Sequence, residues 1–142
     1  MNDFCIEVEL LNGKLPVKAN QSDAGFDLYA SEDVTFEHGK VTKHPLGIRL
    51  KLPKGTYGHI KGKSGLGCKG MCLLAEIVDE DYRGEPHVVA TCLVNEPIVI
   101  KKHQKVAQII IQPHGLPYIM KEVESVSIDT NRGEGGFGST GS

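Results

Sequence analysis

Hydrophobic and polar residues alternate along several short stretches of this chain. Positions 6–10 read Ile-Glu-Val-Glu-Leu, and positions 46–52 read Leu-Gly-Ile-Arg-Leu-Lys-Leu. Successive side chains of a β-strand point to opposite faces, so a period of two residues predicts strands with one buried face. We therefore expect short strands at both places.

Three further runs are rich in β-branched residues and predict more strands: Val88–Val94, Ile98–Ile100 and Val106–Ile111. Gly, Pro and Asn interrupt the chain between such runs, for example at Asn95-Glu96-Pro97 and at Pro113-His114-Gly115. Many short strands at close spacing, with turn residues between them, are typical of an all-β barrel or sandwich.

One stretch fits two interpretations. Met71, Leu74, Ala75 and Val78 recur at helical spacing, so the pattern alone permits a helix. Gly70, directly before this stretch, favours a break in the chain followed by a hairpin.

The composition is that of one globular domain. The chain has 142 residues, of which 39% are hydrophobic, and its formal net charge is −2. Lys and Arg are scattered, whereas a nucleic-acid surface normally needs a basic stripe, so we expect no nucleic-acid partner. An anionic ligand must then be held by a local group of residues.

The sequence also bears on compartment and redox state. No apolar stretch approaches the length of a membrane span, and the first residues do not resemble a secretion signal. We expect a soluble protein with no membrane partner, in the cytoplasm, or in the nucleus if its origin is eukaryotic or viral. The cysteines, at positions 5, 68, 72 and 92, fit neither a disulfide framework nor a zinc site. We interpret them as reduced thiols that are mostly small apolar fillers.

Two segments in the first half carry candidate chemistry. Asp23–Leu28 places carboxylates beside strand residues, which alone is also typical of an edge or turn. In Gly62–Gly70, Ser64 is suited to cap a short helical turn and Gly70 to end it. With Lys63 alongside, the N–H groups of such a turn can bind an anion. A P-loop is excluded because only three residues separate Gly58 from Gly62.

Three more segments follow. Ile77–Gly84 contains Asp79-Glu80-Asp81-Tyr82-Arg83, which is either a solvated turn or a carboxylate placed to orient a water molecule. Lys105–Gln108 places a glutamine in an apolar strand, where it is either a pocket residue or part of a polar face. Arg132–Gly141 combines an arginine able to clamp phosphate, glycines that allow close backbone approach, and one aromatic ring.

Taken together and in this order, the five segments resemble the five motifs of the homotrimeric dUTPase family. Asp-x-Asp-Tyr-Arg-Gly and Arg-Gly-x-Gly-Gly-Phe-Gly-Ser-Thr-Gly are the most specific of them, and Gly-Lys-Ser is similar to the retroviral branch. The resemblance implies a jelly-roll-like all-β barrel with one short helix, formed by residues 1–131. Residues 132–142 would be a glycine-rich lid that closes the site of a neighbouring subunit in the trimer.

The resemblance also implies roles for individual residues. Asp79 matches the carboxylate that orients water for attack on the α-phosphorus, and Tyr82 matches the ring that packs against deoxyribose. Asp27 matches a carboxylate that contacts Mg²⁺ through water, the metal being held mostly by phosphate oxygens. The other substrate-binding positions implied are Lys63, Ser64, Gly65, Leu73, Ile77, Gln108, Arg132, Phe137, Gly138, Ser139 and Thr140.

Three residues depart from the family pattern. Lys63 and Lys105 stand where arginine is commoner, and a lysine offers a point charge instead of a planar fork. Glu76 stands where glycine is usual, next to the hairpin that contacts the base. Its side chain either crowds the pocket, if the position needs close approach or a positive φ, or points outward from a strand.

The activity implied is the hydrolysis of dUTP to dUMP and pyrophosphate, which limits uracil incorporation into DNA and supplies dUMP for dTMP synthesis. Two alternatives stay open. One is a dCTP deaminase-like enzyme of the same fold, although such chains are usually longer and have a different acidic motif. The other is a dUTPase-like nucleotide-binding protein with a regulatory role.

Overall fold

A computed structural model describes residues 4–115 and 118–138 of the chain. Within these residues there is one short helix, and the remaining regular structure is β. The elements are β1 (Glu7–Leu10), β2 (Phe26–Tyr29), β3 (Val34–Phe36), β4 (Thr42–Pro45), β5 (Ile48–Lys51), β6 (Thr56–Lys61), α1 (Ser64–Cys68), β7 (Met71–Ala75), β8 (Ile77–Val78), β9 (His87–Cys92), β10 (Ile98–Ile100) and β11 (Lys105–Pro113).

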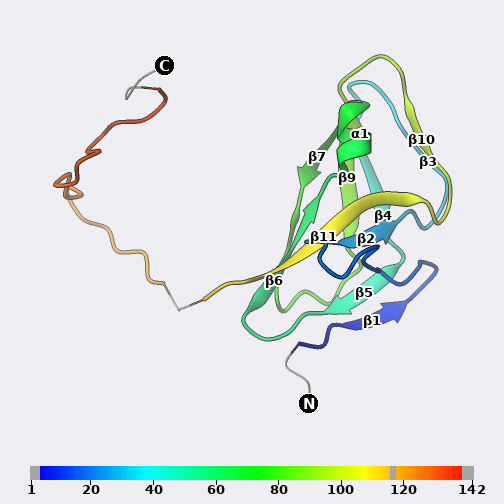
Figure 1. Cartoon of the computed structure of the whole chain (residues 1–142), viewed down its shortest axis with the longest axis horizontal. Coiled ribbons are helices and arrows are strands. Elements are labelled where there is room, and N and C mark those ends of the chain that lie inside the picture. The colour runs from blue at the N-terminus through cyan, green and yellow to red at the C-terminus, as the bar shows by residue number, and fades with distance from the viewer. Residues whose placement is uncertain (1–3, 116–117, 139–142) are drawn as a thin grey trace.

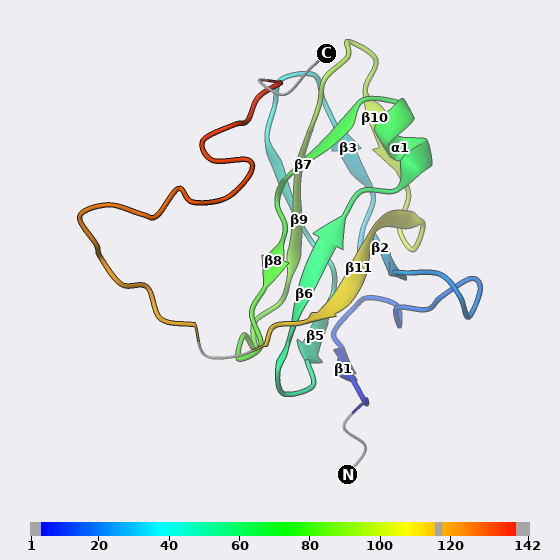
Figure 2. The same ribbon diagram turned by 60° about the vertical axis from the view of Figure 1, so that its left-hand side comes forward.

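The strands pair antiparallel in small sheets that wrap around a common interior (Figures 1 and 2). The largest sheet has the order β2-β11-β6-β8, and the next has the order β4-β9-β7. Two pairs, β1-β5 and β10-β3, complete the barrel. Most neighbours in these sheets are distant in sequence, as in a jelly-roll-like fold, so the predicted all-β class is confirmed.

Alternating residues of the strands form the core. In β5, Ile48 and Leu50 are buried while Arg49 and Lys51 are exposed. Phe36 of β3 is fully buried at the centre of the same cluster. Burial of such side chains supplies the main favourable term in folding, at about 25 cal/mol per Å² of apolar surface. The two-residue period therefore identified the core face of β5 correctly.

The alternation at β1 had a different outcome. Its strand forms as predicted and pairs with β5, but Leu10 stays exposed and Val8 is only half-buried. Val8 nevertheless packs against the core cluster, so only the Leu10 end of the apolar face of β1 is left uncovered by this chain.

The stretch with helical spacing is extended, as Gly70 indicated. β7 pairs with β9, and β8 pairs with β6, so the chain passes from one sheet to the other at Glu76. The two arms of the hairpin are therefore β7 and β9, and residues 79–86 form the loop between β8 and β9. The backbone hydrogen bonds that this stretch makes with β6 and β9 therefore stabilise the extended form over the helix that its local pattern permits.

The short helix α1 lies where it was predicted, but its start differs. Ser64 is the first helical residue and Lys63 occupies the N-cap position, without a side-chain cap. The prediction of Ser64 as the cap was therefore wrong, because the extended backbone of Lys63 already begins the turn. Gly70 has a φ of +100°, a conformation that favours glycine and ends the helical segment as expected.

All four cysteines are free thiols, as expected. Only Cys92 is buried, and Cys5 and Cys68 are exposed, so the interpretation as apolar fillers was wrong for those two. Cys5 precedes β1 and Cys68 is the last residue of α1, and both places face solvent. The sequence alone does not reveal this exposure.

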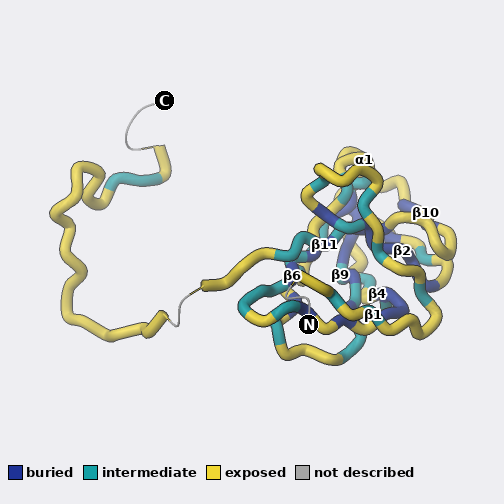
Figure 3. Tube along the Cα trace, turned by 60° about the horizontal axis from the view of Figure 1, so that its bottom comes forward, coloured by how far each residue is buried: buried dark blue, intermediate teal, exposed yellow. Residues whose placement is uncertain are grey.

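The chain beyond the barrel is extended. β11 ends at Pro113, and residues 118–138 form no helix or strand and lead away from the barrel (Figures 1 and 3). Most of these residues are exposed, including the apolar side chains of Val126 and Ile128. Among the residues described, no helix has the length and apolar character needed to cross a bilayer.

Candidate active site

A pocket of about 570 Å³ opens where β2, β11 and the segment from β6 to α1 meet. Three of the five candidate segments contribute to it. Its lining residues are Asp23, Ala24, Gly25, Asp27, Gly62, Lys63, Ser64, Gly67 and Gln108. Of the predicted residues in this region, Gly65 and Lys105 are not among those that line it.

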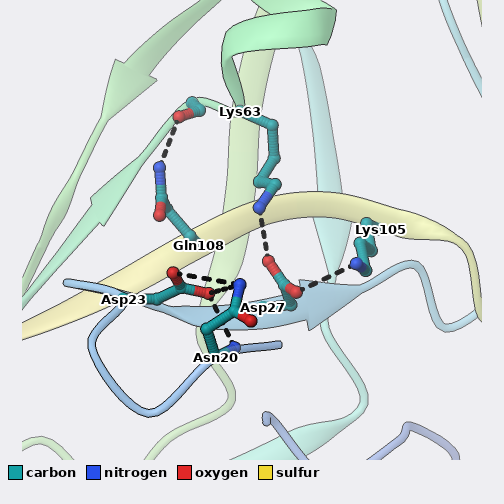
Figure 4. A network of polar contacts seen from close by, with 7 residues as sticks. Asn20, Asp23, Asp27, Lys63, Lys105 and Gln108 are labelled. Carbon is teal, nitrogen blue, oxygen red and sulfur yellow. Dashed lines mark hydrogen bonds and ion pairs between the residues drawn. The ribbon is translucent and has the colours of Figure 1, made fainter. Parts of the chain in front are cut away.

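A buried carboxylate holds two lysines beside this pocket. Only 6% of the Asp27 side chain is exposed, and its Oδ1 lies 2.5 Å from Lys63 Nζ. Its Oδ2 lies 3.2 Å from Lys105 Nζ (Figure 4). The register of β2 and β11 shifts between Lys105 and Ala107, at a bulge of the kind that redirects side chains next to functional sites.

The two lysines also determine the charge of Asp27. Burial by itself would raise the pKa of this carboxyl. Hydrogen bonds and charge from Lys63 and Lys105 together outweigh that effect and lower the pKa below its ordinary value of 3.8. Asp27 is therefore ionised at neutral pH, and it keeps both ammonium groups near the pocket.

Gln108 connects the first two candidate segments. It lies directly opposite Asp27 on β11, and its Nε2 donates a 2.9 Å hydrogen bond to the carbonyl of Gly62. A Cβ at Gly25 would lie 2.5 Å from Gln108 Oε1, so glycine is needed there for this side chain to fit. Gln108 thus belongs to the pocket and not to an unrelated polar face.

The third segment lines a separate pocket, of about 270 Å³. Asp79 and Tyr82 lie there at the start of the loop that follows β8, next to the bend at Glu76. The complete lining is Lys43, Ile60, Ala75, Glu76, Ile77, Val78, Asp79, Tyr82, Glu85, Pro86, His87 and Val89. Of the two predicted base-contacting residues, Ile77 lines this pocket and Leu73 does not.

Asp79 and Tyr82 are both accessible to a ligand. Asp79 is exposed, and among the described residues its carboxylate has no hydrogen bond or ion pair. The Tyr82 hydroxyl donates to the Glu85 carbonyl at 3.3 Å, and a Cβ at Gly84 would lie 2.5 Å from the Tyr82 ring. The glycine of the Tyr-Arg-Gly sequence is thus needed for the ring to lie against the loop.

The two pockets are far apart within one chain. Val78 lies opposite Gly58 in the antiparallel β6–β8 pair, so Asp79 lies beyond Gly58 towards Tyr57. Lys63 is six positions after Tyr57 along a mostly extended chain, which at ~3.3 Å per residue gives a separation on the order of 20 Å. A carboxylate must be within hydrogen-bond reach of the water that it activates. One chain therefore cannot bring its own Asp79 to a phosphate in its own first pocket.

Glu76, the unusual residue beside the third segment, does not have a positive φ, so this position needs no glycine for its backbone. Its carbonyl accepts a hydrogen bond from the Ile60 N–H at 2.7 Å. Its carboxylate faces β6, 3.9 Å from His59 Nε2 and 3.8 Å from Lys61 Nζ. The side chain lines the edge of the second pocket and is directed towards the neighbouring strand.

The described part of the fifth segment, residues 132–138, lines neither pocket. Figure 1 shows residues 132–138 separated from the barrel. Arg132 Nε donates to the carbonyl of Gly135 at 2.6 Å, and Phe137 and Gly138 are exposed. Ser139 and Thr140 lie outside the described residues.

Oxygen ligands for a metal are present, but not as a closed cage. Asp23 and Asp27 both line the first pocket, and Asp23 accepts a hydrogen bond from the Asn20 N–H at 2.9 Å. Among the described residues no group of three or more His, Cys, Asp or Glu side chains could hold a metal ion. Because both oxygens of Asp27 are paired with lysines, this set fits only Mg²⁺ that is held mainly by substrate phosphates and water, with Asp27 reached through water.

Three polar residues of the second pocket were missed by the sequence prediction: Lys43, Glu85 and His87. Lys43 and His87 come together because β4 pairs with β9. That pairing joins segments more than forty residues apart, and neither segment has a chemical motif of its own.

The fold is an antiparallel β-barrel. Its first pocket is lined by glycines, a lysine and the start of a helix, which is an arrangement typical of a β-barrel protein with an anionic ligand. The dUTPase family model matches residues 12–141, and the chain belongs to the dUTPase family. The predicted family is thereby confirmed.

Relatives are similar over nearly their whole length. A deoxyuridine 5'-triphosphate nucleotidohydrolase of Alkaliphilus metalliredigens is 39% identical, covering 97% of this chain and 98% of the relative. One from Clostridium kluyveri is 42% identical over 89% of this chain and 90% of the relative. One from Paramecium bursaria Chlorella virus 1 is 34% identical over 99% of both.

Solved structures support the fold. The dUTPase of Staphylococcus bacteriophage 80alpha, in complex with dUpNHpp, superposes with a TM-score of 0.86, at 24% identity over 97% of this chain and 99% of that one. A D95N mutant dUTPase from phage phi11 of S. aureus, described with a structural Mg(II) ion, has a TM-score of 0.77 at 21% identity, covering 85% of this chain and 97% of that one.

We expect the contacts of Asp27 to make the stability of the protein depend on pH. Because the fold lowers the pKa of Asp27, its contribution is fully present above about 3.8, the ordinary value, and is lost as the pH falls through the lower folded value. Asp27→Asn should reduce the free energy of unfolding at pH 7 by about 1–3 kcal/mol, the range for charge-assisted hydrogen bonds.

The measurement is urea unfolding at fixed protein concentration between pH 7 and pH 3, where the difference from the wild type should shrink. Glu37→Gln is the matched control, because the Glu37–Lys40 ion pair is exposed. A difference that is the same at both pH values would contradict the role of the ionised carboxylate.

Proposed function

We propose that this protein hydrolyses dUTP to dUMP and pyrophosphate. The main observation behind the proposal is that the candidate site residues lie in two separate pockets. One pocket offers Lys63, with Lys105 beside it, and backbone N–H groups to an anion. The other presents Asp79, whose carboxylate has no partner among the described residues, beside Tyr82. Membership of the dUTPase family and the names of full-length relatives support the choice of substrate.

The first pocket binds the triphosphate. Lys63 and Lys105 supply positive charge, and Ser64 with Gly65 presents the start of α1 to the phosphate oxygens. Asp27 keeps the two lysines in place before the substrate arrives, so little rearrangement is needed. Gln108 holds the loop at Gly62 in position.

The second pocket binds the nucleoside and supplies the water. The backbone at Ile77, which lines this pocket, and at Leu73 in β7, which does not line it, contacts uracil. The Tyr82 ring packs against deoxyribose, where a 2′-hydroxyl would not fit. Asp79 accepts a proton from a water molecule as the water oxygen forms a bond to the α-phosphorus. The bond from that phosphorus to the bridging oxygen breaks in line, and pyrophosphate leaves.

Mg²⁺ is the metal proposed for this reaction, with Asp27 contacting it through water. When bound, it neutralises negative charge on the phosphate oxygens. A relative of known structure is described with a structural Mg(II) ion, which supports this choice of metal.

A homotrimer makes the site complete. Because Asp79 and the phosphate pocket of one chain are on the order of 20 Å apart, a neighbouring chain must bring its Asp79 and Tyr82 to this pocket. The exposed Leu10 of β1 and the exposed apolar residues of 118–138 offer surface for such contacts. Arg132, Phe137, Gly138, Ser139 and Thr140 of another chain then close over the nucleotide.

In the cell this activity limits uracil incorporation into DNA and supplies dUMP for dTMP synthesis.

The proposal is tested by pyrophosphate release from dUTP, dTTP, dCTP and UTP in the presence of Mg²⁺. We expect rapid turnover of dUTP alone, because the hairpin excludes a 5-methyl group and Tyr82 excludes a 2′-hydroxyl. Ammonia release from dCTP would support the deaminase-like alternative. Tight binding of dUTP with negligible turnover would support the regulatory one.

Asp79→Asn should lower kcat for dUTP by at least about a hundredfold, because the amide cannot accept the proton from water. The affinity for dUpNHpp, measured by calorimetry, should change little, since the substitution preserves size. Near wild-type turnover of this variant would exclude Asp79 as the base. Glu37→Gln serves as a surface control.

A chain that ends at Arg132 should retain the barrel and lose most of its turnover. The barrel strands end at Pro113, so their packing does not need the last ten residues. Steady-state kinetics and the mass of the assembly in solution should be measured together. Unchanged kcat and KM would show that residues 133–142 do not close the site.

A further inference from the structure

The loop that carries Asp79 and Tyr82 is held at two points by glutamate side chains. This loop, residues 79–86, connects β8 to β9 and lies at the surface. A loop of this kind is mobile unless side chains fix it. Glu80 and Glu85 are each half-buried, and neither carboxylate points freely into solvent.

The first anchor joins Glu80 to the turn before β6. The Gly55 N–H donates a 2.5 Å hydrogen bond to Glu80 Oε1. The same oxygen lies 3.3 Å from His114 Nε2, and the His114 N–H donates to the Gly55 carbonyl at 2.9 Å. Glu80 therefore ties the loop to the beginning of β6 and to the residue that follows β11.

The second anchor joins Glu85 to the turn before β5. The Gly47 N–H donates a 2.6 Å hydrogen bond to Glu85 Oε2. The backbone carbonyl of Glu85 accepts from the Tyr82 hydroxyl at 3.3 Å and lies 2.8 Å from His87 Nδ1. The residue that holds this end of the loop therefore also contacts the ring of the second pocket.

Both anchors use the same chemistry. Gly47 and Gly55 each have a positive φ, +71° and +80°, and each stands directly outside a strand. Their N–H groups donate to the two carboxylates and not to a strand ladder. A hydrogen bond from a backbone N–H to a carboxylate is charge-assisted and stronger than a neutral one.

The consequence for Asp79 follows from its place in the chain. On one side it continues from β8, which is paired with β6, and on the other side it is bonded to Glu80, which is tied to the turn before β6. Arg83 Nη1 also donates to the Glu80 carbonyl at 2.7 Å, which keeps the turn closed. The backbone of Asp79 is thus held from both directions, although its carboxylate has no partner in the part of the chain that the structure describes.

We infer that Glu80 and Glu85 are positioning residues: their carboxylates, bonded to the N–H groups of Gly55 and Gly47, hold Asp79 and Tyr82 where a substrate bound mainly by another chain needs them. The inference rests on the proposed function. A shift of about 1 Å in a reacting group can reduce a rate a hundredfold, so the anchoring of an otherwise exposed loop matters for turnover.

The test compares alanine and glutamine at each position. Glu80→Ala and Glu85→Ala remove the acceptor, and each should lower kcat for dUTP by about tenfold or more while KM changes less than about threefold. Glu80→Gln and Glu85→Gln keep an acceptor oxygen for the glycine N–H, and each should retain kcat within about threefold of the wild type. Glu37→Ala, at an exposed ion pair, is the control and should leave kcat unchanged.

Two results would overturn the inference. One is an alanine variant at each position with wild-type kcat. The other is a kcat as low in the glutamine variants as in the alanine variants, with KM unchanged in both. A hydrogen-bond acceptor for the glycine N–H would then make no difference to turnover.

Amide hydrogen exchange at Gly47 and Gly55 gives a second readout that does not depend on turnover or on the folding of an alanine variant. Both amides should be protected in the wild-type protein, and each should exchange faster in the glutamine variant of its own partner, because a neutral acceptor binds more weakly. Rapid exchange of both amides in the wild type would overturn the inference. A wild-type protein that protects both amides but leaves dUTP intact would instead reject the proposed function.

Discussion

The pairing of β6 on both of its edges determines where the functional groups of this protein lie. β11 on one edge brings Gln108 level with Lys61, and through β2 it brings Asp27 into the same face. β8 on the other edge carries the chain to Asp79. Because a strand is extended and stiff, the two groups are held apart at opposite ends of it. The proposal that a second chain completes the site rests on this separation.

A second constraint is electrostatic. Asp27 is a buried carboxylate, and burial of a charge is unfavourable unless partners compensate for it. Lys63 and Lys105 provide that compensation, and both lie beside the first pocket. In the proposed function, the same three side chains thus serve both the stability of the barrel and the binding of phosphate. The carboxylates of Glu80 and Glu85 act similarly on the loop of the other pocket, where backbone N–H groups are the partners.

Some features of the fold and of the candidate site could be predicted from the sequence, and others could not. The strand at β5 and the turn at Gly70 were predictable, since local periodicity and backbone preference decide them. The cap of α1 was not, because Lys63 takes the N-cap position without a side-chain cap, and its side chain pairs instead with Asp27 on a distant strand. Lys43 and His87 reach the second pocket only through the pairing of β4 with β9, and long-range pairing leaves no local signal.

The sequence by itself determined the all-β class, the order of the five segments and the family to which they belong. Strand periodicity and motifs are patterns of residue types a few positions apart, so they can be recognised in the sequence without the structure. Only the tertiary structure decided that three segments share one pocket while Asp79 and Tyr82 line another, that Glu76 faces β6, and that Glu80 and Glu85 bind glycine N–H groups. These relations arise from contacts between strands that are distant in sequence. The register of the sheets brings those residues together, and their spacing along the chain does not.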